Sequence, residues 1–153
     1  MSNFQTALVQ LPLVRESSGE RVRTPEDVYR VCGDIANLAQ EAFTVLALDV
    51  KNRLINRHLV SLGLADASLV HPREVFRAAI GEDGGACCAL LLTHNHPSGD
   101  PTPSAEDLRI TRQLIQAGRI IDIKVMDHVV IGRPRNGSPA FVSMREGGLC
   151  AFD

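Results

Sequence analysis

The sequence lacks three features that would each point to a broad class of protein. No apolar run in its 153 residues approaches the roughly 20 residues that a membrane-spanning helix needs. The N-terminus shows no basic leader followed by a long apolar stretch, so we expect no secretory signal. Positive charge is not in excess, because 16 Lys and Arg stand against 18 Asp and Glu. We therefore expect a cytoplasmic protein without a membrane partner.

The net charge of −2 gives no general attraction to nucleic acid, since nucleic-acid-binding domains usually carry a basic surface. Nearly all of the positive charge is arginine, which suits phosphate binding, but the arginines are scattered among acids. The composition argues against an overall basic face and leaves a local patch open. Nucleic acid is thus a partner that the charge does not support.

The four cysteines form no C-x-x-C pair, the spacing typical of zinc and redox motifs. Cys87 and Cys88 are adjacent in the apolar run CCALLLT, and free cysteine is one of the residue types most often buried. We expect Cys32, Cys87, Cys88 and Cys150 to be buried structural thiols.

The length and the apolar content of 44% are those of one ordinary globular domain, large enough to bury a hydrophobic core without disulfide bonds or a structural metal ion. Residues 1–23 are expected to be a weakly ordered lead-in, and residues 24–153 a single domain. Helices alternate with strands, which predicts an α/β layered fold. Helices are predicted at about 24–40, 71–80 and 104–118, and strands at 43–49, 54–62, 87–93, 121–126, 128–131 and 140–144.

The segment 93–107, with the sequence THNHPSGDPTPSAED, carries most of the chemistry. His94 and His96 are two residues apart, so on an extended chain both imidazoles point to the same side. Asp107 is three residues after the presumed helix cap, Ser104, and its carboxylate can turn back toward the histidines. Two nitrogens and one oxygen at about 2.0–2.2 Å leave the fourth tetrahedral position of Zn²⁺ for water. We predict a catalytic zinc site on His94, His96 and Asp107.

Each fragment has a plainer explanation when it is taken alone. An H-x-H pair at a strand end often consists of exposed histidines without a functional role. Ser104-x-x-Asp107 is simply a helix N-cap followed by an acidic residue at the third position of the helix. Here both occur within fourteen residues, joined by a loop that Pro97, Pro101 and Pro103 stiffen. The combination favours a metal site.

A zinc hydrolase also needs a residue that moves protons. Glu41 is the candidate, because it lies at the junction between the first predicted helix and the first predicted strand. Glu82 and Asp83, which precede the predicted metal-bearing strand, are the alternatives.

These residues resemble the JAMM motif of the MPN+ (JAB1) metalloprotease superfamily, which combines an upstream glutamate with H-x-H-P-x-G and S-x-x-D. More narrowly, HNHPSGDPTPSAED, the upstream VHPREVFRAAI and the downstream MDHVVIG are similar to the RadC family, over roughly residues 24–148. The resemblance implies a cytidine-deaminase-like fold, a three-layer α-β-α sandwich around a mixed sheet. It also implies zinc on the two histidines and the aspartate, Glu41 as general acid and base, and a Ser104 hydroxyl that stabilises the oxyanion.

Members of this superfamily cleave peptide or isopeptide bonds, so the resemblance implies a zinc metallopeptidase or isopeptidase acting on a peptide or protein. RadC proteins are named for DNA repair, and a nucleic-acid-acting protein, either repair-associated or a metal-dependent nuclease, is the alternative. Phosphodiester cleavage more often uses two metals bridged by carboxylates, which are not evident here. The family commonly carries an N-terminal helix-hairpin-helix region, for which residues 1–23 are too short, and this weakens the alternative.

Other polar residues have less specific expectations. Asp127 and His128 either orient a zinc ligand from outside or form a capped strand end, and both interpretations stay open. Asn95 should point away from the metal and brace the loop, while His58 and His71 should be structural. Substrate specificity is expected in the loops 63–71 and 132–139, whose sequences predict neither the substrate nor the oligomeric state.

Overall fold

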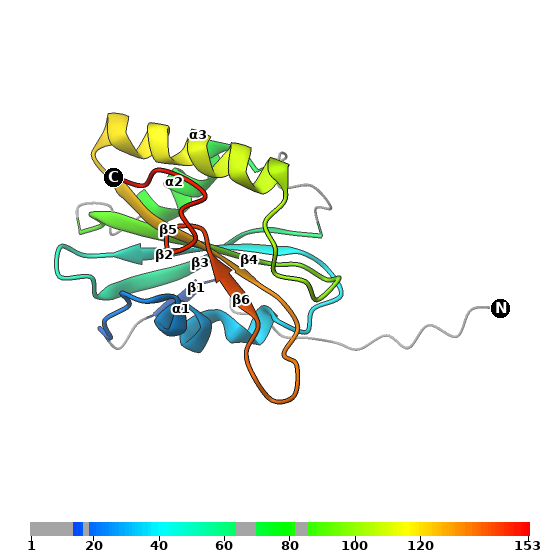
Figure 1. Cartoon of the computed structure of the whole chain (residues 1–153). Helices are drawn as coiled ribbons and strands as arrows, with labels where there is room; N and C mark the ends of the chain where they lie inside the picture. Colours follow the sequence, from blue (N-terminus) through cyan, green and yellow to red (C-terminus); the bar gives the residue numbers. More distant parts are fainter. Residues whose placement is uncertain (1–13, 17–18, 64–69, 82–85) are drawn as a thin grey trace.

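A mixed six-stranded sheet lies between one helix on one face and two on the other, as the predicted three-layer α-β-α sandwich requires (Figure 1). The computed structural model describes residues 14–16, 19–63, 70–81 and 86–153. The elements along the chain are β1 (Val14–Glu16), α1 (Pro25–Cys32), the 3-10 helix η1 (Gly33–Ile35), β2 (Ala42–Leu48), β3 (Leu54–Leu62), α2 (Pro72–Ile80), β4 (Ala89–Asn95), α3 (Ala105–Ile121), β5 (Lys124–Ile131) and β6 (Phe141–Ser143).

The strand order is β1-β3-β2-β4-β5-β6, and every neighbouring pair is antiparallel except β4 and β5. The hairpin of β2 and β3 forms as predicted. A parallel pair cannot be joined by a tight turn and needs a crossover, which α3 supplies here. The chain therefore leaves the end of β4 through a short loop and enters α3 directly, and the predicted metal ligands lie on this connection.

Two apolar clusters fill the spaces on either side of the sheet. Phe43 and Leu92 pack with the apolar faces of α2 and α3, whereas Leu46 and Leu91 pack with α1. β2 and β4 are buried along their whole length, which explains their continuous apolar sequences. Because side chains alternate along a strand, consecutive residues of β4 face different layers. This alternation decides what surrounds each residue of the site.

The three α-helices begin at the predicted caps. Thr24 and Ser104 each form a capping box with the aspartate three residues later, and the His71 side chain accepts from the Arg73 N–H. His71 is therefore structural, as expected. Among the residues described, no helix is both long and apolar enough to cross a membrane.

The first helix ends earlier than predicted, at Cys32 rather than near residue 40. Gly33 follows, a residue that disfavours helix interiors. The buried Arg57 guanidinium, from β3, donates to the Val31 carbonyl at 2.9 Å and pairs with Asp34 at 2.8 Å. These contacts hold the chain in a 3-10 turn. The predicted closing strands 121–126 and 128–131 are in fact one strand, β5, with an irregularity in its pairing near the middle.

Part of the expected lead-in belongs to the sheet. β1 pairs antiparallel with β3, and Val22 is fully buried, with its N–H bonded to the Asn52 carbonyl. The remaining residues before 19 lie outside the described part of the chain.

The expectation of buried thiols holds for Cys32 and Cys87 and is wrong for the other two cysteines. Cys88 is exposed and Cys150 is half-buried. Cys88 comes just before β4 begins, and in an extended chain its side chain points opposite to that of Cys87.

Candidate metal centre

The end of β4, the loop after it and the first turn of α3 bring together His94, His96 and Asp107. His94 lies within β4, which runs two residues further than predicted, and His96 follows it immediately. Asp107 is the third residue of α3, and its carboxylate turns back toward the strand end as expected. The sequence prediction that these three side chains lie together is confirmed.

The spacing of the ligand atoms suits a small ion. His94 Nε2 lies 3.1 Å from His96 Nε2 and 3.3 Å from Asp107 Oδ1, and His96 Nε2 lies 2.9 Å from Asp107 Oδ2. Tetrahedral bonds of about 2.0–2.2 Å would place neighbouring ligand atoms about 3.3–3.6 Å apart. The three atoms therefore need only small shifts to surround one metal ion.

Asp107 is held as a carboxylate. Burial alone would raise its pKa, but the close contacts with the His94 and His96 imidazoles and the hydrogen bond from the Ser104 backbone N–H hold the pKa well below its usual range. The first turn of a helix also favours negative charge. Asp107 is thus a carboxylate at neutral pH.

His96 is oriented by a backbone carbonyl. Its Nδ1 lies 2.9 Å from the Asp100 carbonyl, which can only accept, so Nδ1 carries a hydrogen and Nε2 faces the other ligands. Burial lowers the pKa of His96, but the hydrogen bonds to Asp107 and to the Asp100 carbonyl outweigh this and raise it. The raised pKa favours a proton on Nε2, which would point toward the Asp107 carboxylate, where an ion would bind.

A buried chain of three hydrogen bonds orients His94. The Thr111 hydroxyl donates to the Asp107 backbone carbonyl at 2.6 Å, so its lone pairs accept from His128 Nδ1 at 2.6 Å. His128 Nε2 in turn lies 2.7 Å from His94 Nδ1. If His128 is neutral, its Nε2 accepts from His94 Nδ1–H, and the His94 Nε2 lone pair points toward the other ligands.

Complete burial of His128 lowers its pKa well below the ordinary value, which keeps the ring neutral. His128 therefore orients a predicted ligand from outside, which is the first of the two interpretations left open by the sequence. Asp127 instead matches the second interpretation, a capped strand end. Its carboxylate accepts from the His128 and Arg145 backbone N–H groups and from the Ser143 hydroxyl, so it braces the strand and the following turn.

Glu41 lies beside this group, at the entry to β2. Its Oε1 is 3.6 Å from His94 Nε2, and its side chain is 14% exposed. The alternatives, Glu82 and Asp83, lie outside the described residues. Of the three candidate proton carriers, Glu41 is therefore the one whose position the structure describes. It is near enough to exchange a proton with a molecule bound next to the histidines.

Ser104 caps α3. Its hydroxyl oxygen accepts from the Asp107 N–H at 3.1 Å, which uses a lone pair and leaves the O–H proton free to donate elsewhere. The loop before it is fixed at Gly99, whose φ of 93° favours glycine, and by the Arg133 side chain, which donates to the Pro97 carbonyl. Arg133 belongs to the segment 132–139, one of the two loops expected to set specificity. Most of the other, 63–71, lies outside the described residues.

Sequence reasoning missed Thr111. The only signal in the sequence is its position four residues after Asp107, on the same helix face. Phe43 was also missed as a neighbour of the site. Its ring stacks on His94 at 5.9 Å and meets the edge of His128 at 5.5 Å, so it packs against both imidazoles.

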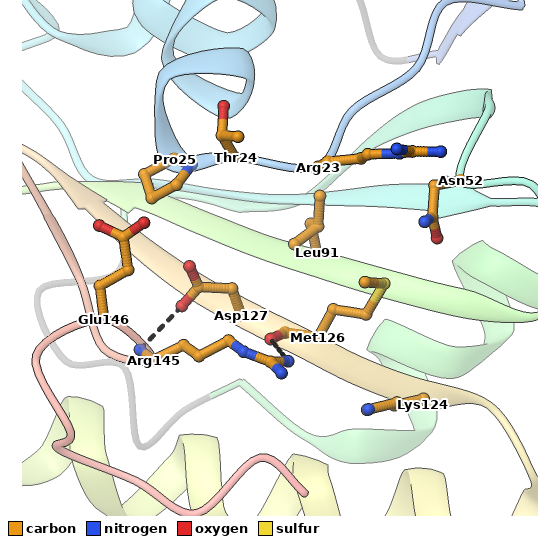
Figure 2. A pocket seen from close by; sticks show the side chains of 10 residues that line it. All are labelled: Arg23, Thr24, Pro25, Asn52, Leu91, Lys124, Met126, Asp127, Arg145 and Glu146. Atoms are coloured by element: carbon orange, nitrogen blue, oxygen red, sulfur yellow. Dashed lines mark hydrogen bonds between the residues drawn. The ribbon is translucent and has the colours of Figure 1, made fainter.

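A cavity of about 570 Å³ lies away from this group, on the face of the sheet that α1 covers (Figure 2). Arg23 and Pro25 form one side of it, Leu91 and Met126 form its floor, and Arg145 lies opposite, as Figure 2 shows. Its lining, within the described part of the chain, includes none of the three predicted ligands and not Glu41. The sheet separates this cavity from the candidate metal centre.

The family model of the RadC-like JAB domain matches residues 22–149, which include every residue of the site. The chain belongs to the RadC-like JAB domain family. The three-layer fold with its mixed sheet is consistent with the JAB/MPN fold expected from the motif.

Curated relatives of this RadC-like JAB domain are named UPF0758 proteins. One from Caldanaerobacter subterraneus subsp. tengcongensis is 43% identical over 144 residues, covering 92% of this chain and 58% of the relative. One from Symbiobacterium thermophilum is 51% identical over 115 residues, covering 75% of this chain and 46% of the relative. One from Listeria monocytogenes is 41% identical over 140 residues, covering 91% and 59%. The chain thus spans about half the length of these relatives, and their names state no activity.

Proposed function

We propose that this RadC-like JAB domain is a zinc-dependent hydrolase of the JAMM type, a metallopeptidase or isopeptidase that cleaves an amide bond. The observation that carries the proposal is the convergence of two Nε2 atoms and one carboxylate within 3.3 Å of one another, with Glu41 Oε1 at 3.6 Å from one of them. The peptide or protein substrate and the cytoplasmic location expected from the sequence form part of this proposal.

His94, His96 and Asp107 would hold the zinc ion. The donor set fits zinc, which takes imidazole nitrogen and carboxylate oxygen and leaves an open position in catalytic sites. When bound, zinc supplies Lewis acidity that activates water and polarises an amide carbonyl. The contacts of Asp107 with the Ser104 N–H, of His96 with the Asp100 carbonyl and of His94 with His128 hold the three ligands in position before an ion arrives.

Glu41 would accept a proton from the attacking water and return it to the leaving nitrogen. Its partial burial and its place beside His94 Nε2 put the carboxylate at the edge of the site, within reach of a substrate. Ser104 would donate its O–H to the oxygen on which negative charge develops, while its lone pair continues to cap α3. Capping and oxyanion stabilisation use different parts of the same hydroxyl, so one residue can do both.

The test combines metal analysis with a panel of peptide, isopeptide and nucleic-acid substrates on the zinc-loaded protein. The Glu41→Gln variant keeps the size and most hydrogen-bonding capacity of the side chain, but its amide cannot carry a proton. We expect wild-type zinc content and a loss of amide hydrolysis of about 10²–10⁴-fold.

Amide hydrolysis that survives in Glu41→Gln would assign the proton carrier elsewhere, and Glu82 and Asp83 would be substituted next. Cleavage of nucleic acid with no amide hydrolysis would replace the proposal with the nucleic-acid alternative.

A further inference from the structure

Asn95 lies between the two histidines in the sequence and points away from them, as expected. It is fully buried at the end of β4. Its Oδ1 accepts from the Ala42 N–H at 2.6 Å, and its Nδ2 donates to the Gln40 carbonyl at 3.0 Å. These two peptide groups stand on either side of Glu41. A single side chain on β4, the strand that carries His94, therefore forms hydrogen bonds with the backbone on both sides of the proposed proton carrier.

The course of the strands explains why a side chain is needed here. Backbone pairing between β2 and β4 ends at Phe43 and His94. Beyond that point the chain turns toward β5, and the His96 N–H donates to the Ile131 carbonyl. Among the described residues, the entry to β2 therefore has no backbone hydrogen bond with β4. The carboxamide of Asn95 supplies one acceptor and one donor in place of a peptide unit and extends the pairing by one step.

The other side of Glu41 is held by the backbone. The Glu41 carbonyl accepts from the Gly63 N–H at 2.9 Å, from the end of the neighbouring strand β3. β2 lies between β3 and β4 in the sheet, so Glu41 is fixed from both directions. Of the two supports, the one from Asn95 connects Glu41 to the strand that carries His94.

We propose that Asn95 is the positioning residue for Glu41, and that its carboxamide fixes the proton carrier relative to the two histidines. The inference rests on the proposed function, because Glu41 is the proton carrier only if the protein hydrolyses amides. Asparagine suits this position because aspartate lacks the donor for the Gln40 carbonyl, and serine is too short to span both peptide groups.

The test uses Asn95→Ser and Asn95→Asp, with Thr93→Val as the matched control. Thr93 is fully buried on the same face of β4, two residues earlier, and its hydroxyl has no hydrogen-bond partner within the described structure. Three quantities are measured on each zinc-loaded variant: hydrogen exchange at the Ala42 amide, zinc affinity, and amide hydrolysis alone and combined with Glu41→Gln.

In Asn95→Ser we expect exchange at the Ala42 amide to rise at least roughly tenfold, because its acceptor is gone. Turnover should fall by about 10²-fold through misplacement of Glu41, while zinc affinity stays within about threefold, since the ligands lie on the other side of the strand. Asn95→Asp keeps the acceptor, so the Ala42 amide should stay protected while turnover falls. In the Glu41→Gln background, neither Asn95 substitution should lower turnover further. Thr93→Val should match the wild type in all three measurements.

Unchanged exchange at the Ala42 amide in Asn95→Ser would overturn the inference, as would turnover losses that multiply with that of Glu41→Gln. An absence of amide hydrolysis in the wild type would overturn the proposed function instead. The exchange measurement would still decide whether Asn95 holds the Glu41 segment, so the two failures are distinguishable.

Discussion

The hydrogen-bond chain behind His94 predicts that two chemically identical substitutions have opposite effects. Thr111 and Thr44 are both fully buried. The Thr111 hydroxyl makes two hydrogen bonds of 2.6 Å, whereas the Thr44 hydroxyl has no partner within the described structure. Valine has nearly the same shape as threonine, so Thr111→Val and Thr44→Val each replace a hydroxyl with a methyl group and leave the packing almost intact.

The magnitudes follow from what each substitution leaves unpaired. Thr111→Val removes the hydrogen bond to the Asp107 carbonyl, worth about 1 kcal/mol, and leaves the buried His128 Nδ1–H without an acceptor, at about 1–3 kcal/mol. The helix propensities of threonine and valine are similar and do not offset this. Thr44→Val removes a buried hydroxyl that has no partner, which itself costs about 1–3 kcal/mol in the wild type. We expect Thr111→Val to lose about 2–4 kcal/mol of unfolding free energy, and Thr44→Val to lose none or to gain.

Urea unfolding of the metal-free proteins measures this difference as a shift in midpoint at constant slope. Zinc affinity is the second measurement. Without Thr111, the His128 proton can move to Nε2 and compete for His94 Nδ1, so the affinity should fall by about 10–100-fold. Equal midpoints for the two variants, or a wild-type zinc affinity in Thr111→Val, would refute the hydrogen-bond chain as described.

Three further outcomes are expected. The purified protein should hold about one zinc ion per chain, and His94→Ala or His96→Ala should abolish zinc binding. Full zinc occupancy in the double variant would show that these histidines do not bind the zinc ion. Ser104→Ala should lose about 0.5–2 kcal/mol of unfolding free energy and also about 10²-fold in turnover. The control Thr24→Ala removes the same kind of capping box from α1 and should lose stability alone. Unchanged turnover in folded, zinc-loaded Ser104→Ala would show that Ser104 only caps the helix. Because the pKa of His96 is raised in the folded metal-free protein, its stabilising contribution is fully present below the unfolded value of about 6.5 and is lost as the pH rises through the folded pKa. The difference in urea midpoint between the metal-free wild type and His96→Gln should therefore shrink with rising pH, and a constant difference would contradict it.

The parts of the site that depend on nearby spacing could be predicted from the sequence. His94 and His96 share a side because they are two residues apart on an extended chain, and Ser104 and Asp107 form a capping box because they are three apart. The same holds for the start of each α-helix. These features need no knowledge of which strands pair.

The parts that depend on contacts distant in the sequence could not be predicted. Thr111 and His128 meet only because β5 packs parallel to β4 under α3, and nothing in their local sequence specifies this. The early end of α1 depends on Arg57, 26 residues after the carbonyl that it binds. The resemblance to a family supplied the layer order, but it did not supply these individual contacts.

The ligands and their supporting residues also differ in how much of the protein must be folded to bring them together. His96 and Asp107 are eleven residues apart, so bringing them together closes a short loop at small entropic cost. The contacts that place Glu41 and orient His94 span 53 and 34 residues, and they require β2 and β5 to be in register on either side of β4. In the proposed enzyme, a partly unfolded chain would therefore lose the arrangement needed for hydrolysis before it lost the contact between His96 and Asp107. Metal retained at weakened affinity would then report order in that short stretch of chain, whereas full affinity and turnover would report the integrity of the whole sheet.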